Sequence, residues 1–134
     1  MKFTIGIDPG KSTGVAIYDR QSKKLIALSN ENFVSALKLI KTSVAPDDVF
    51  ACVVEVPRTK ANWHKDKSGT TAHNIGRVCR EAELMSAMLM DMGYKVITQP
   101  PKGKVKANVF KQITGWEGSS NEHTRDAAML CFDL

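Results

Sequence analysis

The sequence predicts one α/β domain in which helices cover a mixed β-sheet. Three β-rich segments occupy the N-terminal part of the chain, and the apolar run Val49–Val56 is typical of a strand that is covered on both faces. After that run, apolar residues recur three and four positions apart, which is the helical period. The chain has 134 residues, enough for one hydrophobic core and too few for two ordinary domains, so we expect a single domain over residues 1–134.

The first three expected strands form an antiparallel meander. Lys2–Asp8 and Thr13–Asp19 are rich in β-forming residues, and Lys24–Ser29 follows after a polar turn. Asn30 is expected to cap a helix that ends in the segment VAPDD. The apolar positions of this helix, spaced three and four apart, are Phe33, Leu37 and Ile40.

The longest helix is expected after a polar, basic loop that runs from Pro57 to about Thr71. Its apolar stripe has the spacing of a face that packs in the core, and Gly93 is expected to end it. The stripe consists of Ile75, Val78, Ala82, Met85, Leu89 and Met92.

The C-terminal part of the chain is expected to add one strand and two helices. Tyr94–Thr98 is the expected fifth strand, and a short helix over Lys104–Ile113 follows it. A last helix is expected from Ser119, because the spacing from Ser119 to Glu122 is that of a capping box.

The composition excludes several classes of protein. The chain has no apolar run long enough to span a membrane, and it begins with a strand-like segment rather than a signal peptide. Cys52, Cys79 and Cys131 are odd in number and lie far apart among apolar residues, so neither a disulfide framework nor a cysteine metal site is indicated. We therefore expect buried thiols and a cytoplasmic location.

Basic residues gather in two stretches. The net charge is +5; Arg58–Arg80 holds six basic residues and one acid, and Gln99–Thr114 holds four lysines and no acid. Two such stretches in a small domain favour a polyanionic partner, although solvated surface loops would have the same composition.

Two of the expected strands each carry one carboxylate near their end. Asp8 and Glu55 stand in otherwise apolar segments, and a buried carboxylate without a partner costs several kcal/mol. A buried lysine or arginine could pair with each, but no expected strand supplies one in a comparable setting. If the two strands are neighbours, their carboxylates meet at one edge of the sheet, where a divalent cation would relieve the repulsion.

The last helix offers two further metal ligands. His123 and Asp126 are three residues apart and therefore share one face of a helix. Alone, such a pair is usually a polar surface stripe, whereas together with Asp8 and Glu55 it completes a set of four ligands. Glu122 is explained more simply by its expected capping role.

These motifs, taken together, resemble one superfamily. The segment IGIDPGKSTGVAIYD, the glutamate in CVVEV, the long helix and HTRDAA are similar to the ribonuclease H-like superfamily, and within it to the RuvC-type Holliday junction resolvases. The resemblance implies a ribonuclease H-like mixed five-stranded sheet flanked by helices. It also implies that Asp8, Glu55, His123 and Asp126 are both the metal ligands and the catalytic residues.

The resemblance further implies a metal-dependent endonuclease for branched DNA. Two Mg²⁺ or Mn²⁺ ions in each active site would promote hydrolysis of the phosphodiester. The expected substrate is a four-way junction, with flaps and forks as alternatives. Because symmetric cutting of a junction needs two active sites, we expect a homodimer, for which the methionine-rich long helix offers a surface.

Residues expected to contact DNA lie in the glycine-rich turn after the first strand and in the two basic stretches. Trp63, among basic residues, could stack on bases or wedge between them at a branch point, or could instead pack against the domain. Gly10, Ser12 and Gly14 could keep the backbone close to phosphates, or could simply form a hairpin turn. The expected DNA-binding residues are Lys11, Ser12, Arg58, Lys60, Trp63, Lys65, Lys67, Arg77, Lys102, Lys104 and Lys106.

Three other functions remain open on sequence grounds. A related class of small nucleases that mature ribosomal RNA resembles the chain at GIDPG and RDAAMLCFDL, but carries an acid where this sequence has YKVITQ. A nucleotide-binding domain of the actin and sugar-kinase type would need a second lobe. A protein that binds branched DNA without cutting it is opposed only by the complete set of four ligands.

Overall fold

A mixed five-stranded sheet forms the centre of the molecule, and its strand order is β3-β2-β1-β4-β5. The structure is a computed structural model that describes residues 1–57 and 69–134, with side chains described outside 69–78. β1, β2 and β3 pair antiparallel, whereas β4 and β5 lie parallel to β1. The strands are β1 (Phe3–Asp8), β2 (Thr13–Asp19), β3 (Lys24–Glu31), β4 (Val49–Glu55) and β5 (Val96–Gln99). This is the predicted fold class.

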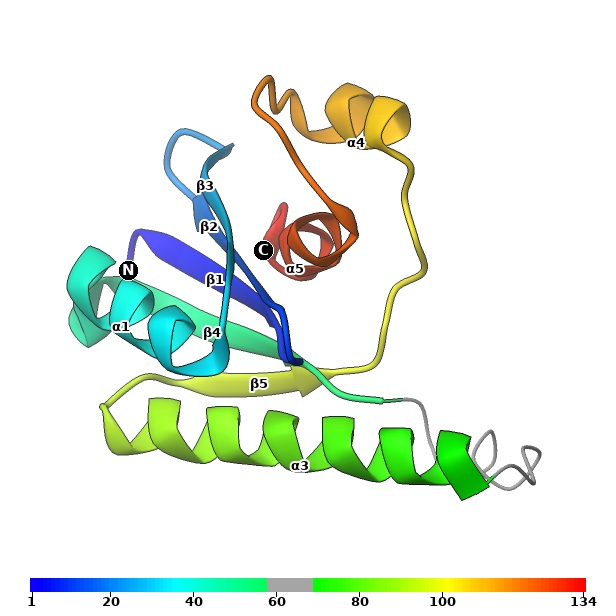
Figure 1. The fold of residues 1–134 in the computed structure, drawn as a ribbon. Helices are drawn as coiled ribbons and strands as arrows, with labels where there is room; N and C mark the ends of the chain where they lie inside the picture. The colour runs from blue at the N-terminus through cyan, green and yellow to red at the C-terminus, as the bar shows by residue number, and fades with distance from the viewer. Residues whose placement is uncertain (58–68) are drawn as a thin grey trace.

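Helices cover both faces of the sheet (Figure 1). α1 and α3 lie on one face, and α5 crosses the other face above β1 and β2. A single 3₁₀ turn, η1 (Pro46–Asp48), leads into β4. The helices are α1 (Phe33–Ser43), α3 (Gly69–Asp91), α4 (Ala107–Thr114) and α5 (Glu122–Cys131).

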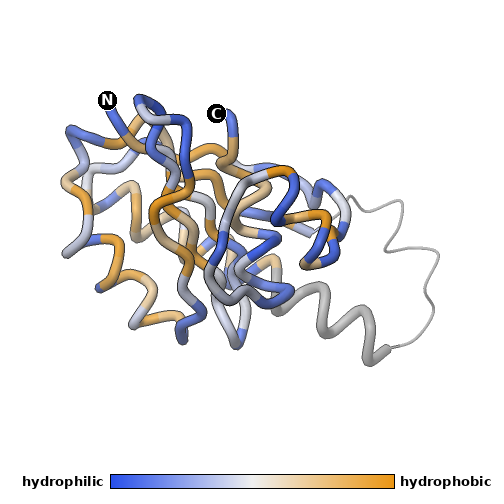
Figure 2. Tube along the Cα trace, turned by 90° about the horizontal axis from the view of Figure 1, so that it is seen from above, coloured by the Kyte–Doolittle hydropathy of each residue, from blue (hydrophilic) through white to orange (hydrophobic). Residues whose placement is uncertain are grey.

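Each face of the sheet has its own hydrophobic core, because side chains alternate along the strands. Ile5 and Ile7 of β1 point toward α1 and α3, whose buried residues include Ile40, Met85 and Leu89. The opposite face packs Ala16, Tyr18 and Leu25 against α5 and Phe110 of α4. In Figure 2 orange, hydrophobic stretches run through the middle of the trace and also along helical turns at its edge.

α5 approaches the sheet unusually closely, and two glycines permit this. A Cβ atom at Gly6 would collide with the carbonyl oxygen of Ala127, and one at Gly14 would collide with the carbonyl oxygen of His123. The first turns of α5 therefore lie almost directly on the backbones of β1 and β2. Gly14 serves this contact, and the approach to phosphates considered from the sequence stays a prediction.

α1 and α5 start later than the sequence indicates. β3 continues to Glu31, which pairs with Thr13, so the side chain of Asn32 caps α1 and Asn30 remains in the strand. At α5 the capping box is formed by Asn121 and Thr124. The prediction that Ser119 and Glu122 form this box is therefore wrong, and Glu122 is free to act elsewhere.

Two other boundaries also differ from the prediction. Tyr94 belongs to the turn that closes α3, because its hydroxyl donates a hydrogen bond of 2.5 Å to the carbonyl of Val44 and its amide bonds to Leu89. β5 consequently starts at Val96. α4 starts at Ala107 rather than Lys104, which leaves the residues from Pro100 to Lys106 as an extended connection, here called the lysine arm.

The cysteines are free, as expected. Cys52 and Cys131 are buried, and burial raises the pKa of each thiol to about 12, whereas Cys79 is only half-buried. Among the helices of the described residues, none combines the length and the apolar character needed to cross a membrane.

Candidate active site

Asp8 and Glu55 end two neighbouring parallel strands. Ile7 of β1 is paired with Val54 of β4, so the next residue on each strand reaches the same edge of the sheet. Both side chains lie on the face that α5 covers, because Ile7 and Val54 belong to the opposite core and neighbouring residues alternate. The sequence analysis required β1 and β4 to be neighbours for these carboxylates to meet, and the two strands are indeed paired.

α5 brings Asp126 and His123 to the same place. One carboxylate oxygen from each of Asp8, Glu55 and Asp126 can be chosen so that all three atoms lie within 4.8 Å of one another. The Nδ1 atom of His123 lies 3.4 Å from Oδ2 of Asp8. His123 is thus at the rim of the cluster, with 45% of its side chain exposed, and the three carboxylates form the centre.

The three acids hold their protons more tightly than usual. Burial is the main cause for Asp8 and raises its pKa; the charge of Asp126 adds to this effect. Burial, a hydrogen bond to Asp8 and the charge of Asp8 raise the pKa of Glu55 to about 8. Burial and the charge of Glu55 raise the pKa of Asp126. The cluster therefore retains a proton near neutral pH unless positive charge replaces it.

Lys104 supplies positive charge to this cluster. Its ammonium group lowers the pKa of Asp8, Glu55 and Asp126, although burial and mutual repulsion outweigh it. The same ammonium group forms an ion pair with Glu122, in the first turn of α5. Lys104 thus lies between a surface carboxylate and the acidic cluster.

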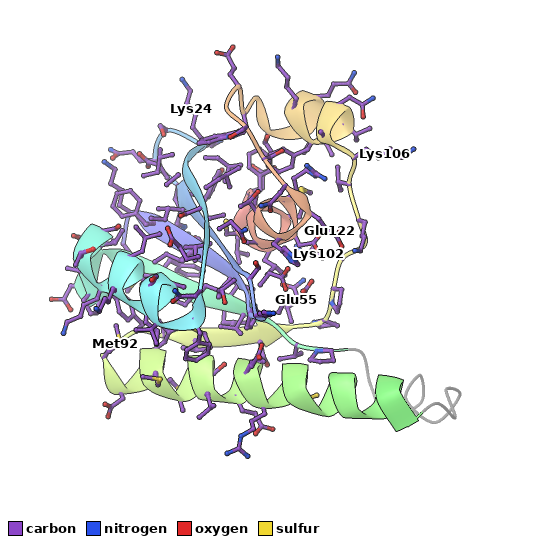
Figure 3. The ribbon with its side chains drawn as sticks, viewed as in Figure 1. Lys24, Glu55, Met92, Lys102, Lys106 and Glu122 are labelled. Carbon is purple, nitrogen blue, oxygen red and sulfur yellow. The ribbon has the colours of Figure 1, made fainter. Side chains whose placement is uncertain are left out.

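The cluster forms the floor of a cleft of about 840 Å³. The turn after β1 forms one wall and carries Lys11, and the lysine arm forms the other wall and carries Lys104. Figure 3 shows Glu55 where β4 ends, below α5, with Glu122 and Lys102 between α5 and the lysine arm. The cleft is lined by Asp8, Pro9, Gly10, Lys11, Ser12, Glu55, Pro101, Gly103, Lys104, Glu122, His123 and Asp126. An acidic floor between basic walls suits a substrate phosphate held above bound cations.

Most of the residues expected at the site that the structure describes do meet there. Lys11, Ser12 and Lys104 line the cleft, whereas Lys102 and Lys106 lie on the lysine arm outside its lining. The other expected DNA contacts, namely Arg58, Lys60, Trp63, Lys65, Lys67 and the side chain of Arg77, lie outside the described residues.

Sequence reasoning missed two features of the site. The partnership of Glu122 with Lys104 was hidden by the expected capping box, which explained Glu122 in another way. Arg125 donates hydrogen bonds to the carbonyl of Val105 and to the hydroxyl of Ser120. Its position between His123 and Asp126 could have drawn attention to it, but nothing in the sequence indicates its partners.

Two solved structures share this fold over nearly the whole chain. The structure of T. thermophilus RuvC in complex with a Holliday junction substrate matches with a TM-score of 0.64 at 15% identity, over 99% of this chain and 92% of the RuvC chain. The fowlpox virus Holliday junction resolvase matches with a TM-score of 0.50 at 15% identity, over 96% of this chain and 93% of that chain. No protein-family model matches the sequence, and no curated protein matches it significantly. The structural matches confirm the ribonuclease H-like fold that the motifs predict.

Proposed function

We propose that this protein is a metal-dependent, structure-selective endonuclease that cleaves branched DNA such as Holliday junctions. The observation that carries the proposal is the convergence of Asp8, Glu55 and Asp126, from two strands and a helix, at the floor of a cleft with lysines on its walls. The fold shared with two Holliday junction resolvases supports the choice of substrate.

The donor set fits hard divalent cations. Carboxylate oxygens are the ligands that Mg²⁺ and Mn²⁺ prefer, and the neighbouring imidazole of His123 is well tolerated by Mn²⁺. The raised pKa values of the acids support the same assignment, since a bound cation would replace the retained proton. When bound, two such ions would supply the charge that favours attack of water on a phosphodiester and departure of the 3′ oxygen.

Each ligand has a distinct role in this proposal. Asp8, on the central strand, would help to hold both ions, and Glu55 would help to hold one of them. His123 and Asp126 would hold the other. The rigid ends of β1 and β4 and the close contact of α5 with the sheet keep these groups in place, which limits the reorganisation that binding requires.

The lysines of the cleft would hold the DNA backbone. Lys11 and Lys104 both line the cleft, so a phosphate bound in it would lie near two positive charges. Lys102 and Lys106 would extend this contact along the lysine arm, and Ser12 would donate a hydrogen bond to a phosphate. The basic stretch that contains Trp63, Lys65 and Lys67 remains a prediction for recognition of the branch point.

We also propose a homodimer. α3 exposes Leu84 and Met88, with 45% and 44% of each residue accessible, one helical turn apart and beside its buried stripe. Burial of this surface against a second copy would place two active sites on one molecule, as symmetric cutting requires.

A cleavage panel tests the proposal. Labelled four-way junctions, flaps, forks, linear duplexes, single strands and structured RNA are incubated with the protein in Mg²⁺, Mn²⁺ or EDTA. We expect cleavage of branched DNA with either metal and none in EDTA, with Asp8→Asn as the inactive control. Preferred cleavage of RNA would indicate the alternative role in ribosomal RNA maturation. Tight junction binding without cleavage in any metal would indicate a binding protein.

A further inference from the structure

Arg125 connects three separate segments of the molecule. It lies on α5, half-buried, and its Nε donates a hydrogen bond of 2.9 Å to the carbonyl of Val105 in the lysine arm. Its Nη1 donates a hydrogen bond of 3.1 Å to the hydroxyl of Ser120, in the loop before α5. One guanidinium group thus ties the arm and that loop to the helix that carries His123 and Asp126.

The lysine arm has few other attachments to α5 among the described residues. Lys104 reaches Glu122, but both side chains are largely exposed, so this ion pair is weak. The Val105 side chain packs at the edge of the core beneath α5. The hydrogen bond from Arg125 to the Val105 carbonyl is therefore the polar contact that holds the backbone of the arm close to α5.

The distance between the arm and α5 determines where the lysines of the arm lie. Val105 directly follows Lys104, whose charge reaches all three carboxylates of the cluster. Lys102 and Lys106 flank it on the same extended segment. An arm that left α5 would carry these charges away from the cleft wall.

We propose that Arg125 is the positioning residue for DNA binding: it holds the lysine arm against α5, so that Lys104 faces a phosphate bound in the cleft while Lys102 and Lys106 flank it along the arm. The inference rests on the proposed function and deepens it. Lysine cannot replace arginine in this role, because the planar guanidinium donates in two fixed directions to two partners and a single ammonium does not. Arg125 acts through the arm lysines and not by touching the DNA.

Limited proteolysis tests the anchoring without any assay of activity. A protease that cuts after lysine is applied to the folded protein, and fragments ending at Lys102, Lys104 and Lys106 are quantified by mass spectrometry. In Arg125→Met we expect these cuts to become about tenfold faster, because the arm opens locally. Lys41→Met, an exposed lysine of α1, is the matched control and should leave the rate unchanged.

Two further variants keep the anchoring testable if Arg125→Met does not fold. Arg125→Lys keeps the charge and should still release the arm. Ser120→Ala removes one partner of Arg125 and leaves α5 intact, and should speed the cuts about twofold to threefold. Unchanged cutting of the arm in the folded Arg125 variants would overturn the inference while leaving the proposed nuclease untouched.

A double-mutant cycle tests the link to DNA. The three arm lysines are replaced by glutamine, with and without Arg125→Met, and the Kd for a four-way junction is measured in Ca²⁺, together with KM and kcat in Mn²⁺. With the lysines present, Arg125→Met should raise Kd and KM about fivefold and change kcat less than about twofold. Without them, the same change should have less than about a twofold effect.

The outcomes of the cycle separate the inference from the proposed function. An equal loss in both backgrounds would show that Arg125 contacts the DNA or acts through folding, and would overturn the positioning role. A parent protein that neither binds nor cuts any substrate would overturn the proposed function, whatever the proteolysis shows.

Discussion

Glu55 shows how one residue links burial to chemistry. Its carboxyl group is half-buried beside Asp8, and this environment raises its pKa to about 8 from an ordinary value of 4.5. A group whose pKa is higher in the folded state than in the unfolded state binds its proton more tightly when folded. Its contribution to stability is therefore complete below the unfolded pKa and is lost as the pH rises through the folded pKa.

The stability of the metal-free protein should therefore fall between about pH 4.5 and pH 8. We expect a loss on the order of 1–3 kcal/mol in the free energy of unfolding, after allowance for partial solvent screening. Urea unfolding in EDTA at pH 5 and pH 8 measures it. Glu55→Gln removes the titrating group and should flatten the profile, and Mn²⁺ should restore stability at pH 8; a profile that rises with pH in EDTA would contradict this account.

The proposed ligand residues should respond to substitution according to the roles proposed for them. Asp8→Asn, Glu55→Gln and Asp126→Asn keep size but remove charge, so each should lower kcat by at least about 100-fold and leave junction binding in Ca²⁺ within a few-fold. His123→Ala should lose most activity. His123→Asp exchanges the imidazole for a harder oxygen ligand, so activity should survive with a preference shifted from Mn²⁺ toward Mg²⁺. Wild-type cleavage by Asp8→Asn would show that the cluster is structural.

At the scale of elements, β1 and β2 offer a matched pair of buried hydroxyl groups. Thr4 and Thr13 are both fully buried. The hydroxyl of Thr4 has no hydrogen-bond partner among the described residues, whereas that of Thr13 donates a bond of 3.0 Å to the carbonyl of Gly10, in the turn beside Asp8.

Replacement of each threonine by valine should have opposite effects. Thr4→Val removes an unpaired buried polar group and should stabilise the protein by about 1 kcal/mol. Thr13→Val leaves the Gly10 carbonyl without this donor and should destabilise it by about 1 kcal/mol. Chemical denaturation of the two variants side by side gives the comparison, and a shift of the same sign in both would refute it.

The contact of α5 with the sheet is the element-scale feature that builds the site. Gly6 and Gly14 remove the side chains that would otherwise separate the helix from β1 and β2. His123 and Asp126 can then reach carboxylates that end strands far away in the sequence. The glycines therefore affect the acidic cluster through packing.

At the scale of the whole molecule, the exposed apolar face of α3 should decide the oligomeric state. Leu84→Glu combined with Met88→Glu places charge on this face without entering the core, since both side chains are already exposed. We expect the wild type to sediment as a dimer and the double variant as a monomer at micromolar concentration. The monomer should nick a junction but lose paired, symmetric cuts.

Val34→Glu provides the control for this experiment. Val34 is an exposed apolar residue of α1, with 60% of its surface accessible, outside the proposed interface. It should change neither the sedimentation nor the pairing of cuts. A wild-type chain that sediments as a monomer with and without junction DNA would exclude the dimer.

The sequence determined the strands and most of the helices, since these follow from local patterns. β2 spans the predicted residues, and the described part of the long apolar stripe is buried at Ala82, Met85 and Leu89. Asp8 and Glu55 stood out for the same reason, as single charges in apolar strands. Element boundaries were less accurate, because strand pairing kept Asn30 in β3 and a tertiary hydrogen bond kept Tyr94 out of β5.

Only the tertiary structure decided the distances among the carboxylates and which residues line the cleft. The distances among Asp8, Glu55 and Asp126 depend on a parallel strand pair and on a helix seated against two glycines, which are contacts between residues far apart in the chain. The position of Lys104 depends on an extended arm whose last three residues, 104–106, the sequence pattern assigned to a helix, and Arg125 bonds to that arm from another element. Local periodicity records which side chains are buried, but side-chain partners are chosen by the packing of the whole chain, and the chemistry of the site follows from those partners.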